Sequence, residues 1–131
     1  MKNLSNKIGD MELDGLIADV NPAPIVRGGT IRKGDAKVTL KRGTILAKSS
    51  KDNKLVVLGN SAGDSETLTA DCILCDDVEV GTDADVTVPV YFSGCFNSGK
   101  CIVKDAYTVT EADKDALRMR GIVFKAVSAA V

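Results

Sequence analysis

Regular alternation of apolar and other residues is the clearest pattern in this sequence. From Val86 to Phe92, valines and a phenylalanine take every second position, with Thr87, Pro89 and Tyr91 between them. Side chains of a strand point alternately to its two faces, so the pattern predicts a half-buried β-strand. Proline has no amide hydrogen, which puts Pro89 at a sheet edge or where the strand is locally unpaired. The following Gly94 indicates a bulge or a close backbone approach.

Shorter apolar stretches, separated by polar turns, predict further strands. The longest intervening turn is Gly59–Glu66, which is predicted to be a surface loop. Asp76 and Asp77 interrupt one stretch, which is therefore expected to be bent or bulged. The predicted strands cover residues 36–40, 44–48, 54–58, 70–80, 101–103 and 122–127. Many short strands at close spacing are typical of a small barrel or sandwich, so the fold class is mainly β.

One short helix is predicted near the C-terminus, over residues 111–120. Thr110 is a good N-cap, and acidic residues in the first turn and basic residues in the last turn complement the helix dipole. Gly121 is a natural stop. A helix of this length is not stable alone, so it is expected to pack on the sheet.

The first 28 residues differ in texture from the rest. Glycines and prolines interrupt scattered apolar residues, and Asn21–Pro24 favours extended backbone. We interpret residues 1–28 as an extended arm with little core of its own, and residues 29–131 as a β-rich domain. The arm is either a mobile terminus or a segment that orders on a partner by adding a strand to a sheet.

Charge and composition argue against several classes of function. Lys and Arg number 17 and Asp and Glu 18, and there is no histidine. Without a basic surplus, direct nucleic-acid binding is not expected. Without histidine, neither a Ser-His-Asp triad nor a Cys-His pair is possible, and the commonest metal ligand is missing. Asp76 and Asp77 are a candidate carboxylate pair, but neighbours on a strand point opposite ways, so we expect a solvated bend and no enzyme.

Four cysteines raise the question of a metal or redox site. Cys72 and Cys75 form a C-x-x-C, and Cys95 and Cys101 follow later. This arrangement is compatible with zinc or with redox chemistry. On a strand, however, positions three apart face opposite ways, so we expect reduced cysteines that act as small apolar residues, with no metal and no cofactor.

No apolar run is long enough for a signal peptide or a membrane helix. We therefore expect synthesis in a cytoplasm, no membrane partner, and release by cell lysis. Aromatic residues make up only 4% of the chain, so its core is thin and some apolar surface is expected to serve partners.

The order of motifs resembles the lambda-type head decoration protein family of tailed phages. The segments that carry the resemblance are KRGTIL (41–46), YFSGCFN (91–97) and LRMRGIVF (117–124), and it covers residues 29–127. It implies a small barrel-like body without catalysis. It also implies trimers at the three-fold and quasi-three-fold positions of the expanded head, on the outer surface of the virion, with the major capsid protein as partner.

In that family the N-terminal arm touches the capsid. By position, the candidate capsid-binding residues are Leu16, Ile17, Val20, Pro22, Pro24 and Ile25. The alternative is another β-rich virion module, such as a tail, baseplate or surface-adhesion domain.

Overall fold

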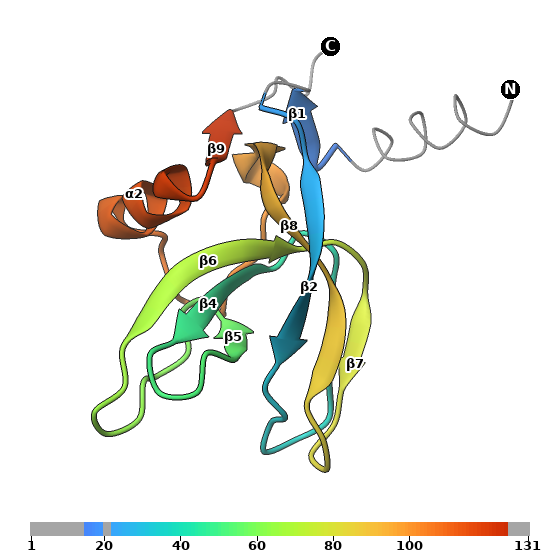
Figure 1. Cartoon of the computed structure of the whole chain (residues 1–131), viewed down its shortest axis with the longest axis vertical. Coiled ribbons are helices and arrows are strands. Elements are labelled where there is room, and N and C mark those ends of the chain that lie inside the picture. Colours follow the sequence, from blue (N-terminus) through green and yellow to red (C-terminus); the bar gives the residue numbers. More distant parts are fainter. Residues whose placement is uncertain (1–14, 20–21, 126–131) are drawn as a thin grey trace, which may run out of the picture.

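The chain folds into a series of short strands, with an α-helix near the C-terminal end (Figure 1). The structure is a computed structural model that describes residues 15–19 and 22–125. Its elements are β1 (Ile17–Asp19), β2 (Ile25–Ile31), β3 (Val38–Leu40), β4 (Ile45–Ser49), β5 (Leu55–Val57), β6 (Leu68–Leu74), β7 (Val78–Val80), β8 (Val86–Asn97), the 3₁₀ turn η1 (Ser98–Lys100), α2 (Glu111–Met119) and β9 (Ile122–Lys125).

Five of these strands close into a barrel, which confirms the predicted fold class. The order is β8, β2, β5, β4 and β6, and β6 pairs again with β8 to complete the circle. The C-terminal half of β8 runs beyond the barrel, where it pairs with β1 on one side and β9 on the other. β3 and β7 form a separate two-stranded sheet.

Alternation along the barrel strands produces two apolar cores, one inside the barrel and one outside it. The inner cluster includes Ile31, Leu46, Leu55, Cys72, Leu74, Val80 and Val90. The outer cluster includes their strand neighbours Ile45, Val56, Ile73 and Tyr91, which Leu117 of α2 and Ile122 of β9 cover. Nearly every position of the central strands is therefore buried on one face or the other.

The helix follows its sequence prediction closely. The Thr110 side chain accepts a hydrogen bond from the Asp113 N–H, and the Asp113 side chain accepts one from the Thr110 N–H, which completes a capping box. Gly121 takes a left-handed φ of 94° directly after the C-cap residue Arg120. Leu117 is the buried residue that docks the helix on the outer core, as the short length requires.

The predicted strand 70–80 is divided into two strands of different sheets. A bulge does occur within β6, because Leu46 pairs with Cys72 whereas its neighbour Ala47 pairs with Ala70. Asp71 therefore has no partner residue on β4. The chain then leaves the barrel after Leu74, and the Arg42 N–H donates to Asp77 Oδ1 at 2.8 Å in the bend that follows. The bend at Asp76 and Asp77 therefore separates two strands, the bulge lies at Asp71, and the prediction of one continuous strand is wrong.

Two other expectations on strands change with the tertiary structure. Segment 101–103 is not a strand: only Ile102 forms a bridge, with Thr44. β8 is the central strand of the sheet, but over Val86–Pro89 it pairs with β2 alone, and its pairing with β6 covers only Val90 and Tyr91. Pro89 thus lies just outside the ladder to β6, although its carbonyl accepts a hydrogen bond from the Cys75 N–H on that side. At Gly94 a Cβ would lie 2.8 Å from the Phe96 ring, so the predicted close approach is present.

Candidate interaction surface

The predicted capsid-contacting residues occupy different environments. Leu16 is only 2% exposed and belongs to the outer core. Ile17 lies in β1, paired with Phe96. Pro22 and Pro24 are half-buried, whereas the Ile25 side chain is 50% exposed. Val20 lies outside the described residues. The structure therefore does not gather the set on one surface.

Leu16 ties the start of the described chain to the body. The Asn97 N–H donates to the Leu16 carbonyl at 2.7 Å, and a Cβ on Gly43 would come within 3.3 Å of Leu16 Cδ1. Residue 28, where the sequence suggests that the arm ends, lies inside β2. The described part of residues 1–28 is therefore integrated into the sheet, and the division into arm and domain stays a prediction.

The candidate surface is the open side of β2, which we call the β2 edge and define as residues 25–30. β8 pairs with β2 along its whole length, from Ile25 to Ile31. On the other side, the neighbour among the described strands is β5, which joins only at Ile31. The intervening backbone groups of β2 on that side have no strand beside them in the described part of the chain.

Two hydrogen bonds show which residues point outward at this edge. The Arg32 N–H donates to the Leu55 carbonyl, so Arg32 faces away from β8. The Cys75 N–H donates to the Pro89 carbonyl, so Pro89 faces β6 and forms no hydrogen bonds with its β2 partner Gly28. Since orientation alternates along a strand, Val26 and Gly28 direct their N–H and C=O groups outward.

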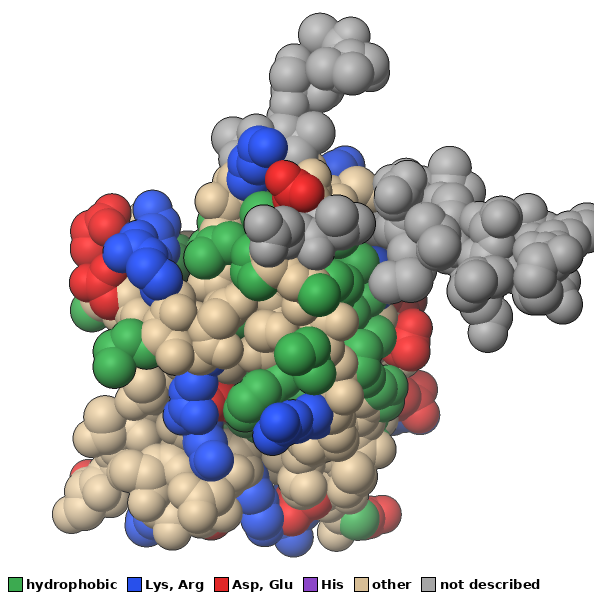
Figure 2. Space-filling model, turned by 45° about the horizontal axis from the view of Figure 1, so that its top comes forward, with side chains coloured by type: hydrophobic (Ala, Val, Ile, Leu, Met, Phe, Trp, Pro, Cys, Tyr) green, Lys and Arg blue, Asp and Glu red, His purple; other side chains and the backbone are tan. Residues whose placement is uncertain are grey.

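Apolar side chains flank these outward backbone groups. Ile25 and Val26 are each 50% exposed. The guanidinium carbon of Arg27 lies 4.5 Å from the centre of the Phe92 ring, a cation–π contact. Figure 2, which views this side of the molecule with its upper end tilted forward, shows hydrophobic side chains gathered in a band with basic side chains beside them. An open strand edge flanked by exposed apolar side chains is suited to pairing with a strand of another protein.

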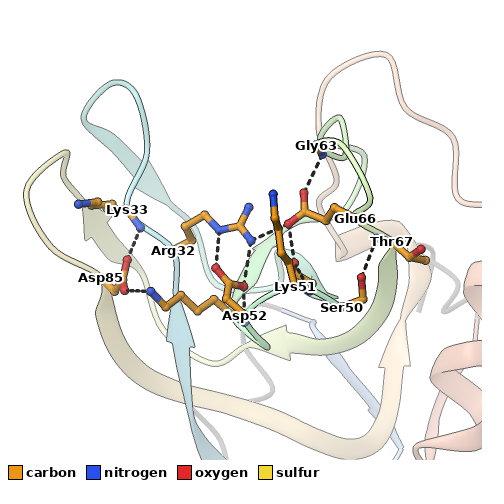
Figure 3. A network of polar contacts seen from close by, with 11 residues as sticks. Arg32, Lys33, Ser50, Lys51, Asp52, Gly63, Glu66, Thr67 and Asp85 are labelled. Carbon is orange, nitrogen blue, oxygen red and sulfur yellow. Dashed lines mark hydrogen bonds and ion pairs between the residues drawn. The ribbon is translucent and has the colours of Figure 1, made fainter.

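The opposite end of β2 is anchored by ion pairs (Figure 3). Arg32 Nη2 lies 2.9 Å from Asp52 Oδ1 and 2.7 Å from Glu66 Oε2, and Ser49 also donates to Glu66. Hydrogen bonds from Arg32, the Gly63 N–H and Ser49 lower the pKa of Glu66 to about 2. The neighbouring Asp85 pairs with Lys54 and accepts from the Lys33 N–H, and both contacts lower the pKa of Asp85.

A comparison with models of known protein families shows which family this sequence matches. The family model described as Bacteriophage lambda head decoration protein D matches residues 8–122. The chain belongs to this family. No curated protein matches the sequence.

The matched range corrects the extent of the resemblance. It begins at residue 8, so most of residues 1–28 lie within the family pattern and not outside it, and it ends at 122. The β2 edge and the strand that pairs with it are therefore both part of the family's common sequence region.

Three of the four cysteines of this head decoration protein pack in the two cores, and the fourth, Cys95, is buried as well. Cys72 lies in the inner cluster and Cys75 packs against the outer one, as the opposite faces of a strand require. All four are free. Burial raises the pKa of the Cys101 thiol to about 12, and burial with the nearby Asp71 raises that of Cys72 further.

The other candidate functional residues are exposed or lie apart from one another. Asp76 and Asp77 lie at the surface, and the Arg42 N–H lowers the pKa of Asp77. Within residues 15–19 and 22–125, no three His, Cys, Asp or Glu residues are placed to hold a metal ion. In the same part of the chain, no helix has the length and apolarity needed to cross a membrane.

Of the β2 edge, sequence reasoning named only Ile25 as a candidate contact, and residues 26–30 were missed. The signal was present in the paired Gly28 and Gly29. A Cβ on Gly29 would lie 2.7 Å from Leu55 Cδ1, so this glycine allows close packing within the barrel.

Proposed function

We propose that this protein binds the exterior of the expanded phage capsid, through the major capsid protein, and stabilises the head against the pressure of packaged DNA. It is made in the cytoplasm of the bacterial host and forms trimers at the three-fold and quasi-three-fold positions. Membership of the head decoration family supports the location. The observation that carries the binding mode is the open β2 edge with half-exposed Ile25 and Val26.

The binding mode is strand addition. A capsid segment that pairs with the outward N–H and C=O groups of Val26 and Gly28 would extend the sheet past β2. The backbone pairing supplies affinity, and Ile25 and Val26 would lose their exposed apolar area in the contact. Of the predicted contact residues, Pro22, Pro24 and Ile25 lead into this edge and are its proposed capsid contacts.

The other predicted residues have a supporting part in this proposal. Leu16 is buried and Ile17 is paired with Phe96, so they position the chain that carries the contacts. Val20 remains a proposed capsid contact by its position in the sequence.

Stabilisation follows from differential binding. A protein that binds only the expanded lattice shifts the equilibrium towards that lattice by mass action. Trimerisation strengthens the effect, because linked contacts raise the effective concentration of each remaining site after the first has bound. Modest affinity at each β2 edge is therefore sufficient.

Binding to expanded heads that lack decoration tests the proposal. Gly28→Pro removes an outward amide and leaves the hydrogen bonds to β8, since prolines are tolerated where the N–H faces away from the sheet. Val26→Asp places a charge on the exposed apolar edge. Each variant is expected to bind heads about tenfold or more weakly, as the loss of a central interface contact does.

Met119→Asp is the matched control, because Met119 is the most exposed large apolar residue in the part of the chain that the structure describes and lies at the end of α2. It is expected to bind as the parent chain does. Unchanged sedimentation of the two edge variants with heads would overturn the binding mode. A head reconstruction that shows single copies in place of trimers would overturn the proposed arrangement.

A further inference from the structure

A cavity of about 470 Å³ lies beside α2, on the outer face of the barrel. α2 and β9 lie side by side (Figure 1), and residues of both line the cavity, together with residues of η1 and of the segment 101–109. Ile45 of β4 and Ile122 of β9 are buried at its base. The volume is within the range of about 300–1,000 Å³ that is usual for small-molecule sites.

The walls of the cavity are apolar. Leu117 attaches α2 to the outer core, but it does not line the cavity. The walls are formed by Val103, Val109 and Val123, and Phe124 is the one aromatic residue among the described lining residues. These side chains leave the space between α2 and β9 unfilled. A lining of this kind is suited to the hydrocarbon part of a ligand.

Of the described residues that line the cavity, two are charged, and both are basic. Lys114 and Arg118 are four positions apart and therefore lie on the same face of α2. Their side chains are 45% and 67% exposed, so the stems lie along the wall while the charged groups reach the mouth of the cavity. Cationic groups at the mouth of an apolar cavity are complementary to a molecule with one anionic end and one apolar end.

The acidic residues of α2 do not cancel this complementarity. Glu111 Oε1 lies 3.6 Å from Lys114 Nζ, and Asp115 Oδ1 lies 3.4 Å from Arg118 Nη1. Both carboxylate side chains are more than half exposed and neither lines the cavity, so these ion pairs are weak and open to competition. The third acidic residue, Asp113, is held in the capping box.

The two other polar residues of the described lining are Ser98 and Cys101. The Cys101 thiol donates to the Asn97 carbonyl at 3.5 Å, so its hydrogen-bonding capacity is used within the chain. Ser98 is exposed on η1 and adds a hydroxyl group that can donate to an anion. Neither residue brings negative charge to the cavity.

We infer that this cavity is a binding site for a small amphipathic anion, of the chemical class of a medium-chain carboxylate. The hydrocarbon chain lies against the valines and Phe124, and the carboxylate pairs with Lys114 and Arg118. A guanidinium group binds a carboxylate through two parallel hydrogen bonds, which favours this head group over a neutral one. No lining residue belongs to the β2 edge, so the site does not depend on capsid binding.

Titration of the full chain, labelled with nitrogen-15, tests the inference by NMR. Octanoate below its micelle concentration is the probe, and 1-octanol is the control that keeps the chain and lacks the charge. Octanoate is expected to shift the amide signals of the lining residues in a saturable way. Octanol is expected to bind about tenfold or more weakly, because it lacks the charged hydrogen bonds.

Paired charge variants test the role of the two cations. Lys114→Gln with Arg118→Gln is expected to weaken octanoate binding about tenfold and to leave octanol binding unchanged. Lys37→Gln with Lys41→Gln is the matched control. It removes the same charge from two exposed lysines that also have loose acidic partners but do not line the cavity. This control is expected to bind octanoate as the parent chain does.

Several results would overturn the inference. Equal affinity for octanoate and octanol, or equal octanoate binding by the two double variants, would show that the cations do not form an anion site. Saturable shifts at Ile25 and Val26 in place of the lining residues would put the binding elsewhere, and the absence of any saturable shift would exclude the site. None of these measurements involves phage heads, so their outcome is independent of the proposed capsid binding.

Discussion

The two ends of β2 differ although they belong to one seven-residue strand. At its beginning, Ile25 and Val26 are half exposed beside an open backbone edge. At its end, Ile31 is buried in the barrel and pairs with Leu55, and Arg32 follows with its two carboxylate partners. One strand therefore combines a surface for association with an anchor to the core.

The comparison shows how a thin domain can keep an exposed strand edge without losing its fold. Hydrogen bonds to β8 run along the whole strand, so the open side is not needed for stability. The ion pairs at Arg32 join the end of β2 to the loops around Asp52 and Glu66. The following variants test this division of roles, from the largest expected effect to the smallest.

Truncating a side chain at each of the two ends of β2 should lower the free energy of unfolding by very different amounts. Ile31→Ala removes a buried side chain from the inner core and is expected to lower the free energy of unfolding by about 2–5 kcal/mol. Val26→Ala, at the exposed end, is expected to change it by no more than about 0.5 kcal/mol. Urea unfolding followed by circular dichroism measures both, and equal costs would show that the open edge is part of the core.

Proline substitutions at adjacent positions test the alternation of backbone groups. Arg27→Pro removes a hydrogen bond from the ladder to β8 and is expected to destabilise the fold by about 1–3 kcal/mol more than Gly28→Pro does. Urea unfolding followed by circular dichroism measures the free energy of unfolding of both variants. If Gly28→Pro is the more harmful, the assignment of the outward side of β2 is reversed.

Acid should weaken the anchored end. The pKa of Glu66 is about 2 in the folded chain against an ordinary value of 4.5, so its contribution is complete above pH 4.5 and is lost as the pH falls through 2. Glu66→Gln should therefore unfold at lower urea than the parent at pH 7 and show a shallower decline in stability between pH 4.5 and 2. Parallel declines in the two proteins would mean that other carboxylates dominate.

The smallest effect is expected at the contact between Arg27 and Phe92. Arg27→Gln loses a cation–π interaction at the surface and is expected to cost about 0.5–1 kcal/mol. Differential scanning calorimetry can resolve such a change, with Arg27→Lys as the control that keeps the charge. A loss of stability in both variants would show that the guanidinium geometry is needed. No loss in either variant would show that this contact does not stabilise the fold.

Much of the fold was predictable because its signals are local. The alternation in Val86–Phe92 and the capping residues around α2 act through neighbours in the chain, and both predictions are confirmed. The first four residues of β2 were assigned to an arm because glycines and prolines interrupt the apolar residues of the stretch 1–28. The place of β2 in the barrel depends on packing of Gly29 against Leu55 and Val90, which are distant in sequence.

The candidate capsid-binding residues also depend on packing that the sequence does not reveal. Their apolar character is visible in the sequence, but Leu16 is buried and Ile25 is exposed because of the elements that lie beside them. Similarly, the apolar stretch 101–103 is not a strand, because only Ile102 reaches a partner, at Thr44.

The sequence by itself determined that this protein is a mainly β domain with one capped helix, and its ordered motifs determined its family. Only the tertiary structure decided that the interior of the barrel and its outer face form two separate cores, and that β2 keeps one side open. The physical reason is that alternation and capping are set within a few residues, whereas the pairing of a strand edge is set by segments that the chain brings together from far apart.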